Sequence, residues 1–429
     1  MNSFLTTLFR ANRPVPEKYQ ANFTHLYMDV IWWGILNGTT LSFLAIYAVR
    51  LGATPTQIGW FNAVPAIVSL VFALPVGHWL SHRQPGKKIF WSSIFNRIFY
   101  LFFLFIPWFL TDKSQVVFII LATLVMSIPM TVFTVGFNSL FADAVPVEWR
   151  GYVVTVRNAI ISIMTVIVSL ISGQILNRIA FPMGYQVIFL LGFVGAAVSS
   201  YHLWFVRPPA NGAPMEEESP ELSLGELETD RTHPSAPARS GRFASMRLDV
   251  LKSPFGKILF LLFFFHLSQY LGIPIFPLYQ VNAVHFSDQV ISIGVGVFNL
   301  MVFVGSTQLI KFFSRFNNRT LMGFGVVLMG MYPALMSVSR NLGMFALTSF
   351  VGGIAWSIVG GILYNFLVER IPVSDRPAYM GWYHLVLNAA ILFGSLGGPF
   401  LATLIGLPDA MLVCAVARLI AGLAILKWG

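Results

Sequence analysis

Charged residues are scarce in this chain: only 10% of its 429 residues are Asp, Glu, Lys or Arg, whereas 56% are hydrophobic. The mean hydropathy is +0.73. A water-soluble domain carries about 25% charged residues, so this chain could not cover a water-facing surface. We therefore expect lipid to be the solvent for most of it. The net charge of +10 is expected in cytoplasmic loops rather than in a nucleic-acid site.

Cysteine is nearly absent, and so is a secretory signal. Cys414 is the only cysteine, which excludes a disulfide framework and a metal site built from several thiolates. The first apolar stretch is short, and Arg10, Arg13 and Pro14 follow it without a small-residue cleavage site. Residues 1–22 are therefore expected to form a cytoplasmic N-terminal tail.

Twelve apolar segments are each close to the roughly 20 residues that a helix needs to cross a bilayer. Loops rich in turn-forming and charged residues separate these segments. The pattern predicts an all-α integral membrane protein. Its twelve expected spans lie near residues 24–49, 57–80, 89–110, 115–142, 152–176, 184–206, 255–280, 289–313, 320–338, 342–368, 378–404 and 407–427.

Lys and Arg are distributed unevenly over the loops. If the N-terminus lies in the cytoplasm, the outer loops hold only Arg50, Lys113, Arg178 and Arg340. Nearly all other basic residues then fall in the inner loops and tails. Because cytoplasmic loops are enriched in Lys and Arg, both termini of this multi-pass cell-membrane protein are predicted to be cytoplasmic.

One inner loop differs from the others in composition. Residues 207–253 are polar and rich in Pro, Ser and Glu, so they cannot bury enough apolar area to fold alone. We expect a flexible cytoplasmic linker here. It would join an N-terminal six-helix bundle (residues 23–206) to a C-terminal six-helix bundle (residues 254–429).

A short polar phrase occurs once in each half of the chain. "ADAVPVEWRGY" (142–152) follows the fourth span, and "VERIPVSDRPAY" (368–379) follows the tenth. Each contains an acid, then Pro-Val, then an Arg four residues after the Pro, and Pro146 matches Pro372 about half the chain further on. Parallel repeats of helices about an axis along the membrane normal are typical of transporters.

The twelve spans, the repeated loop and the segment after the second span together resemble the major facilitator superfamily. In "GHWLSHRQPGKK" (77–88), Gly77, Gly86, Lys87 and Lys88 fit the motif of that family, whereas Ser81 stands where the family usually has an acid. The resemblance covers nearly the whole chain. It implies two pseudo-symmetric six-helix bundles with a substrate cavity between them.

Charged residues in the inner loops are predicted to form a gate by bridging the ends of neighbouring helices when the halves meet. Such exposed pairs are weak, about 0–1 kcal/mol each, but several together can bias an equilibrium of a few kcal/mol. A role in fixing topology is the alternative for Arg150 and Arg376. The predicted gate residues are Gly77, Ser81, Arg83, Lys87, Asp143, Arg150, Glu369 and Arg376.

The resemblance implies that spans 1, 4, 7 and 10 line the central cavity and that spans 2, 5, 8 and 11 flank it. Polar and aromatic residues at mid-depth on these spans are therefore predicted to face the substrate: Asn37, Thr40, His266, Gln269, Tyr270, Trp356, His384 and Asn388. These groups include almost no acid, which favours a neutral or mildly charged organic solute over a divalent metal. A helix–helix hydrogen bond is the alternative for each residue. No metal site and no cofactor is predicted.

Ionisable residues inside the spans need partners. Asp29 in span 1 would cost about 2.5–3.5 kcal/mol at the bilayer centre, so we expect it to pair with Arg157 of span 5 or Arg97 of span 3. Two roles are predicted for Asp29 as alternatives: a structural salt bridge between spans, or a site of proton coupling. Arg418 in the peripheral span 12 is expected at the interface or against a peripheral helix, away from the substrate.

These observations predict a secondary active transporter that moves a small organic solute by alternating access. Both a proton-coupled and an uncoupled mechanism are compatible with them. An enzyme is not expected, because paired carboxylates and nucleophile–base spacings are missing. The alternative is a non-transporting member of the fold that serves as an assembly or scaffold protein for a pigment, lipid or protein partner. We expect a monomer in the lipid bilayer, with a small-molecule substrate and no nucleic-acid partner.

Overall fold

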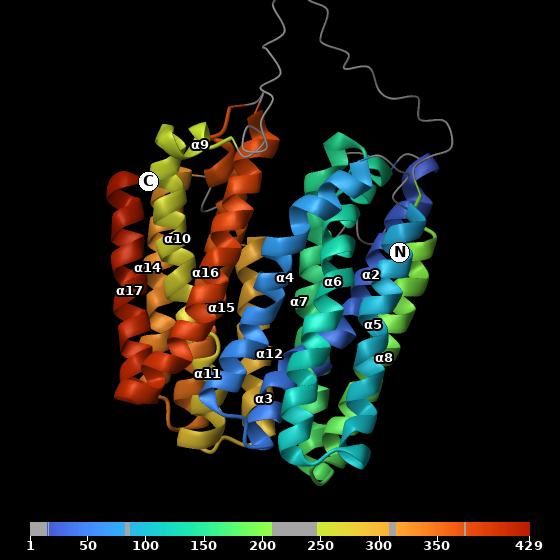
Figure 1. Ribbon diagram of the computed structural model, residues 1–429, viewed down its shortest axis with the longest axis vertical. Coiled ribbons are helices and arrows are strands. Elements are labelled where there is room, and N and C mark those ends of the chain that lie inside the picture. Colours follow the sequence, from blue (N-terminus) through green and yellow to red (C-terminus); the bar gives the residue numbers. More distant parts are fainter. Residues whose placement is uncertain (1–14, 16, 82–85, 208–246, 309–314, 373–374) are drawn as a thin grey trace, which may run out of the picture.

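A computed structural model describes residues 15, 17–81, 86–207, 247–308, 315–372 and 375–429, and every regular element in these ranges is helical (Figure 1). Twelve helical segments are long and apolar enough to cross a membrane. The predictions of an all-α membrane fold and of twelve spans are therefore confirmed.

The first half contains six spans. Its elements are α2 (Glu17–Leu36), η1 (Asn37–Leu41), α3 (Ser42–Arg50), α4 (Pro55–Ser81), α5 (Gly86–Phe109), α6 (Asp112–Ala144), α7 (Val147–Arg178) and α8 (Met183–Trp204). The π-helical turn η1 joins α2 to α3, so these three elements together form span 1. Single π-helical turns are frequent at functional sites.

The second half repeats this arrangement. Its elements are α9 (Asp249–Lys252), α10 (Pro254–Gly272), α11 (Ile275–Leu278), η3 (Tyr279–Ala283), α12 (Asp288–Gln308), α14 (Asn318–Val338), α15 (Leu342–Val368), α16 (Arg376–Ile405) and α17 (Leu407–Trp428). Span 7 consists of α10, α11 and η3, and it is broken after Gly272. The equivalent spans 1 and 7 thus both contain a π-helical turn.

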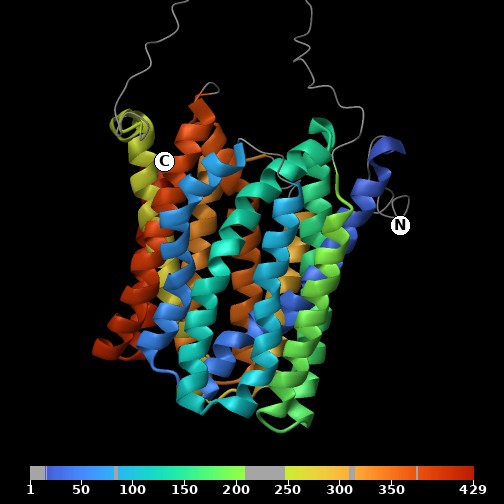
Figure 2. The ribbon, with the colours of Figure 1, turned by 45° about the vertical axis from the view of Figure 1, so that its right-hand side comes forward.

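The start of α2, the end of α8, the short helix α9 and the end of α17 lie at one end of the molecule, which we call the terminal face (Figures 1 and 2). The other end, which we call the opposite face, holds the end of α3 and the start of α12 (Figure 1). An even number of spans in each half explains why the chain enters and leaves each bundle at the same end.

The buried apolar clusters show where the two halves meet. The largest cluster combines residues of both halves near the opposite face, such as Phe43 and Tyr47 with Tyr279 and Phe286. Two other clusters lie toward the terminal face, and each is confined to one half. Apolar burial therefore joins the halves near the opposite face and not near the terminal face.

Two pairs of long helices carry most of the contact between the halves: α4 packs against α16, and α7 packs against α12. Glycines allow close approach at both crossings. A Cβ atom on Gly59 of α4 would lie 2.7 Å from the Ser395 carbonyl oxygen of α16, and one on Gly173 of α7 would lie 1.8 Å from Ser292 Oγ of α12. Helix backbones approach this closely in membranes where small residues line the contact.

The structure differs from the predicted boundaries at the ends of both bundles. α2 begins at Glu17, so residues 17–22 belong to the first span and not to a tail. Asn22 is buried and donates from Nδ2 to the carbonyl oxygens of Ala144 and Arg207, which ties this first turn to the bundle. Within the predicted linker, Asp249–Lys252 form α9, and Val250 is fully buried in the second bundle. The central part of the predicted linker, 208–246, lies outside the described residues.

Candidate functional site

A cavity of about 1480 Å³ lies between the two halves and reaches the terminal face. One wall is the N-terminal half of α7, from Arg150 to Ser162, together with Asn37 of η1. Its second wall comes from the ends of α12, α14 and α15. Spans 1, 5, 8, 9 and 10 thus line this cavity together with Gly429 after span 12, whereas the expected spans 2, 4, 7 and 11 contribute none of the described residues to its lining.

At the opposite face the halves are closed against each other. Arg50, the last residue of α3, forms an ion pair with Asp288, the first residue of α12, at 3.0 Å from Nη2 to Oδ1. Arg50 Nη2 also donates to the Phe286 carbonyl oxygen at 2.6 Å. The large cavity is therefore accessible from the terminal face and sealed at the other.

A second, smaller pocket of about 350 Å³ lies inside the second half. It adjoins the large cavity, because Phe298, Asn299 and Trp356 line both. Its volume falls within the roughly 300–1,000 Å³ of small-molecule sites, which are mostly apolar with a few polar groups. Its further lining includes Gln269, Phe276, Gln280, Tyr332 and Arg418.

Arg418 was expected away from the substrate region, and the structure corrects this. The side chain is 3% exposed, points into the second bundle from α17 and lines the smaller pocket. Its Nε donates to the Ser268 carbonyl oxygen, Nη2 to that of Gln269 and Nη1 to that of Met329, at 3.3, 2.9 and 3.1 Å. Ser268 and Gln269 lie near the broken end of α10, where helix carbonyl groups lose their partners and a cation is favourable.

The predicted cavity residues separate into two groups. Asn37, Gln269 and Trp356 line one or both of these cavities. Asn37 also donates from Nδ2 to Thr165 Oγ1 at 3.0 Å, which fixes its amide against α7. Asn37 thus both lines the large cavity and holds η1 against α7.

The other predicted cavity residues contact neighbouring helices. Thr40 is fully buried beside Gly192 of α8, and Tyr270 packs against Gly394 of α16. His266 Nε2 lies 3.2 Å from the Tyr383 hydroxyl, so it joins α10 to α16. Of these three, His266 matches the helix–helix hydrogen bond stated as the alternative from the sequence. Thr40 and Tyr270 instead pack against glycines of neighbouring helices, and Thr40 Oγ1 has no hydrogen-bond partner among the described residues.

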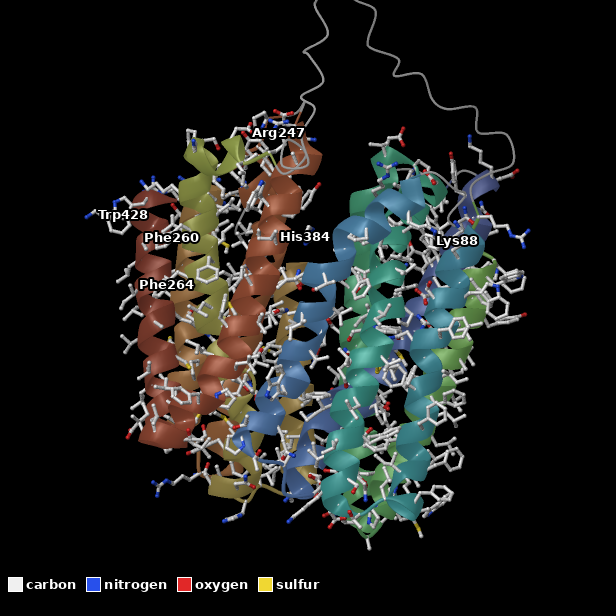
Figure 3. All side chains as sticks on the ribbon, viewed as in Figure 1. Lys88, Arg247, Phe260, Phe264, His384 and Trp428 are labelled. Carbon is white, nitrogen blue, oxygen red and sulfur yellow. The ribbon has the colours of Figure 1, made fainter. Side chains whose placement is uncertain are left out.

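Two further predicted cavity residues lie on α16. The His384 side chain is exposed on this helix, near the boundary between the halves (Figure 3). Asn388 donates from Nδ2 to the His384 carbonyl oxygen at 2.8 Å. Neither residue lines either of the two cavities.

Asp29 lies between two arginines in the first bundle. Its Oδ2 is 3.3 Å from Arg157 Nη2 and its Oδ1 is 4.0 Å from Arg97 Nη2, and both expected partners are therefore present. Ser199 donates to Oδ1 at 2.5 Å. The rings of Trp33 and Phe137 face the two guanidinium groups at 5.0 and 4.9 Å. This buried group joins α2, α5, α7 and α8 and is not part of either cavity lining.

Two predicted gate arginines, Arg150 and Arg376, form no ion pair between the halves with a described residue. Arg150 donates from Nη2 and Nε to the carbonyl oxygens of Ala142 and Val145, at 2.7 and 3.2 Å. It therefore caps the end of α6. The expected pairing of Arg150 with an acid on a neighbouring helix is not formed with any described residue. Arg376 is exposed and forms no ion pair with a described residue. Asp143 is exposed on the last turn of α6.

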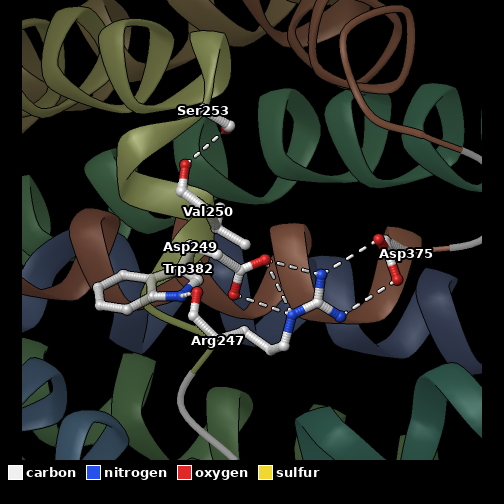
Figure 4. A network of polar contacts seen from close by, with 6 residues as sticks. All are labelled: Arg247, Asp249, Val250, Ser253, Asp375 and Trp382. Atoms are coloured by element: carbon white, nitrogen blue, oxygen red, sulfur yellow. Dashed lines mark hydrogen bonds and ion pairs between the residues drawn. The ribbon is translucent and has the colours of Figure 1, made fainter. Parts of the chain in front are cut away.

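The acids of the second repeated loop bind within their own half. Glu369 accepts a hydrogen bond from Asn318 Nδ2 and pairs with Arg370 at 3.4 Å. Asp375 pairs with Arg247, a residue that sequence reasoning missed: the two guanidinium Nη atoms each lie 3.2 Å from a carboxylate oxygen (Figure 4). Arg247 thereby connects the start of α9 to the start of α16.

The remaining gate residues belong to the loop after span 2. Arg83 lies outside the described residues. Gly77 and Ser81 are in α4 and Lys87 is in α5, and their side chains also lie outside what the structure describes. Next to them, the Lys88 ammonium lies 4.1 Å from the Trp79 ring centre, which links the start of α5 to the end of α4.

Comparison with known proteins agrees with this geometry. The family model of the Major Facilitator Superfamily matches residues 33–265 and 258–429. The chain belongs to this superfamily. Its members are membrane transporters and not enzymes, in line with the sequence prediction.

This chain is similar in sequence to a protein of Deinococcus radiodurans named "Putative sugar efflux transporter". It is 20% identical over 409 residues, which cover 92% of this chain and 95% of the relative. A bacterial homolog of the human lysosomal transporter Spinster has a similar solved structure, with a TM-score of 0.67 and 14% identity over 96% and 97% of the two chains. The nucleoside transporter NupG gives a TM-score of 0.63 and 13% identity over 95% and 98% of the two chains. These two structures establish the fold.

Proposed function

We propose that this chain is a secondary transporter that moves a small organic solute across a cell membrane by alternating access. The observation that carries the proposal is the cavity of about 1480 Å³ between the halves, which opens at the terminal face while Arg50 and Asp288 close the opposite face. A transporter of this type needs a second state, in which the halves tilt so that the terminal face closes and the opposite face opens.

We infer that the terminal face is cytoplasmic, so the structure corresponds to an inward-open state of a monomer. The loops at the opposite face hold only four basic residues, Arg50, Lys113, Arg178 and Arg340. Cytoplasmic loops are the ones enriched in Lys and Arg. The Spinster homolog mentioned above was solved in an "Inward-facing And Unoccupied Conformation".

The solute is proposed to be of sugar or nucleoside size. Asn299 and Trp356 lie at the junction of the two cavities and Asn37 lines the larger one, and amides and aromatic rings bind hydroxylated or planar rings. A relative named as a sugar efflux transporter and the fold shared with a nucleoside transporter support this class.

Coupling to H+ remains part of the proposal, but Asp29 is assigned a structural role in it. Removal of this carboxylate would leave two buried guanidinium groups without a counter-charge. No cavity lining includes Asp29, so water does not reach it through either cavity described above.

Uptake into proteoliposomes tests the transport proposal. Purified protein would be reconstituted and challenged with radiolabelled sugars and nucleosides, with and without a proton gradient. Accumulation above protein-free vesicles is expected for at least one solute, and Asn299→Ala should reduce it. Binding without any movement of solute would instead favour a non-transporting scaffold.

A further inference from the structure

Arg418 is a buried cation with no acidic partner among the described residues. None of the ion pairs among the described residues includes it. In the first half, the buried Arg97 and the 14% exposed Arg157 share Asp29, so the two halves differ in this respect. Carbonyl dipoles compensate the Arg418 charge only in part, because a buried charge is costly unless it is paired.

The guanidinium group of Arg418 has N–H donors that form no hydrogen bond with a described residue. It carries five N–H groups, and three of them reach the carbonyl oxygens of Ser268, Gln269 and Met329. One N–H remains on each of the two Nη atoms. A guanidinium group can bind the two oxygens of a carboxylate through two N–H groups.

The pocket that Arg418 lines has the walls of a ring-binding site. Phe276, Phe298 and Trp356 supply aromatic surface, and Asn299 and Gln280 supply amides. Asn299 Nδ2 donates to the Val295 carbonyl oxygen of its own helix at 2.9 Å, which leaves the amide oxygen as an acceptor for hydroxyl or amino groups. A compact ring with polar substituents fits these walls.

We propose that this pocket binds a small cyclic carboxylic acid, with the carboxylate on Arg418 and the ring between Phe298, Trp356 and Phe276. The inference rests on the proposed function and names the substrate class of its binding site. Either a sugar acid or an aromatic acid presents this chemistry. The incoming carboxylate supplies the counter-charge that Arg418 lacks among the described residues.

Matched pairs of ligands test this inference on the unaltered full-length protein. Binding of glucuronate is compared with that of glucose, and binding of benzoate with that of benzamide, by calorimetry and thermal unfolding at pH 7. At least one acid should bind about tenfold more tightly than its neutral counterpart, the scale expected for a charge-assisted bidentate contact. The pair that shows the preference identifies the ring. Equal binding of acid and neutral compound in both pairs would overturn the inference.

Substitutions locate the effect. Arg418→Gln should remove the preference for the acid, whereas Arg340→Gln, an identical change at an exposed position of the same half, should leave it intact. If Arg418→Gln does not fold because the end of α10 is no longer capped, Asn299→Leu serves instead: it fills the pocket, keeps Arg418 and should abolish binding of the acid. A folded Arg418→Gln protein that still prefers the acid, or an Asn299→Leu protein that still binds it, would contradict the assignment.

Transport measurements distinguish a failure of this inference from a failure of the proposed function. If glucose or a nucleoside accumulates in vesicles and no acid binds in an Arg418-dependent way, transport stands and the carboxylate site is wrong. If an acid binds in an Arg418-dependent way and no solute moves, the carboxylate site stands and the transport proposal is wrong.

Discussion

The guanidinium group of Arg50 and the carboxylate of Asp288 join the two halves across the opposite face, with Nη2 3.0 Å from Oδ1. The two side chains are 26% and 15% exposed, so the pair is only partly screened by solvent. Arg50 ends span 1 and Asp288 starts span 8, and the pair must break if the halves tilt apart at this face. It is therefore the polar counterpart of the apolar cluster that joins the halves there.

Arg50→Ala should shift the protein toward a state that is open at the opposite face. A partly exposed pair is worth about 1 kcal/mol, which changes the ratio of the two states about fivefold. The change is measured by maleimide labelling of Ile291→Cys in a Cys414→Ala background, because Ile291 is 2% exposed in the closed state.

Two variants control this experiment. Arg178→Ala removes an exposed arginine at the same face that has no ion pair with a described residue, and its labelling rate should equal that of the parent. The exchange Arg50→Asp with Asp288→Arg should restore slow labelling. If the exchange labels as fast as Arg50→Ala, the pair does not hold the closed state.

Asp29→Asn should destabilise the first bundle strongly. Breaking a buried ion pair by removing one partner costs about 3–5 kcal/mol, because the other charge is left uncompensated, and here Arg97 and Arg157 are both left. Ser199→Ala removes one hydrogen bond and keeps the charges, so its cost should be about 1 kcal/mol. Thermal unfolding in detergent measures both. An Asp29→Asn protein as stable as the wild type, with coupling lost, would restore Asp29 as a proton-carrying residue.

The spans were predictable because lipid imposes a simple rule on sequence. A helix that satisfies its own backbone and exposes apolar side chains must be long and apolar, and this can be counted along the chain. The partners of Asp29 followed from the same physics, since a charge in a span needs a counter-charge. Arg97 and Arg157 were the available cations at similar depth.

The direction in which a side chain points could not be read in the same way. Arg418 lies on a peripheral span, and the break of span 7 after Gly272 places carbonyl acceptors at the end of α10 that draw it inward, together with the Met329 carbonyl oxygen of α14. Pro274 after Gly272 was the signal in the sequence for this break. Val250 was missed because a single buried residue in a polar segment leaves the composition unchanged.

Gly59→Ala should loosen the contact between α4 and α16. The added methyl group would lie 2.7 Å from the Ser395 carbonyl oxygen, and a helix backbone cannot yield as a flexible side chain can. Overpacking of this kind costs about 1–3 kcal/mol, and we expect faster labelling of Ile291→Cys as the halves separate.

Gly360→Ala is the matched control for this change. Gly360 is also inside a helix, α15, but a Cβ atom there would meet nothing within 4 Å. Alanine is the better helix former by up to about 1 kcal/mol, so this variant should be at least as stable as the wild type. Equal behaviour of the two variants would show that the α4–α16 contact tolerates a wider spacing.

Asp375→Asn should release α9 from the start of α16. Arg247 binds Asp249 and Asp375 together, and the Trp382 indole N–H donates to the Arg247 carbonyl oxygen at 3.1 Å (Figure 4). We expect a change in Trp382 fluorescence and faster proteolysis before Asp249. High salt should give a similar result in the wild type, because the pairs are exposed and screening weakens them.

Alkaline pH should leave the contact between Arg247 and Asp375 intact. Hydrogen bonds to Asp249 and then to Asp375 raise the pKa of Arg247 above its ordinary value. A raised pKa gives a contribution that is complete below the unfolded-state value and is lost only as the pH rises through the folded one. That loss lies above the range in which the protein is handled, so proteolysis rates at pH 7 and pH 9.5 should agree once protease activity is normalised. An increase at pH 9.5 would mean that a group other than Arg247 controls the docking of α9.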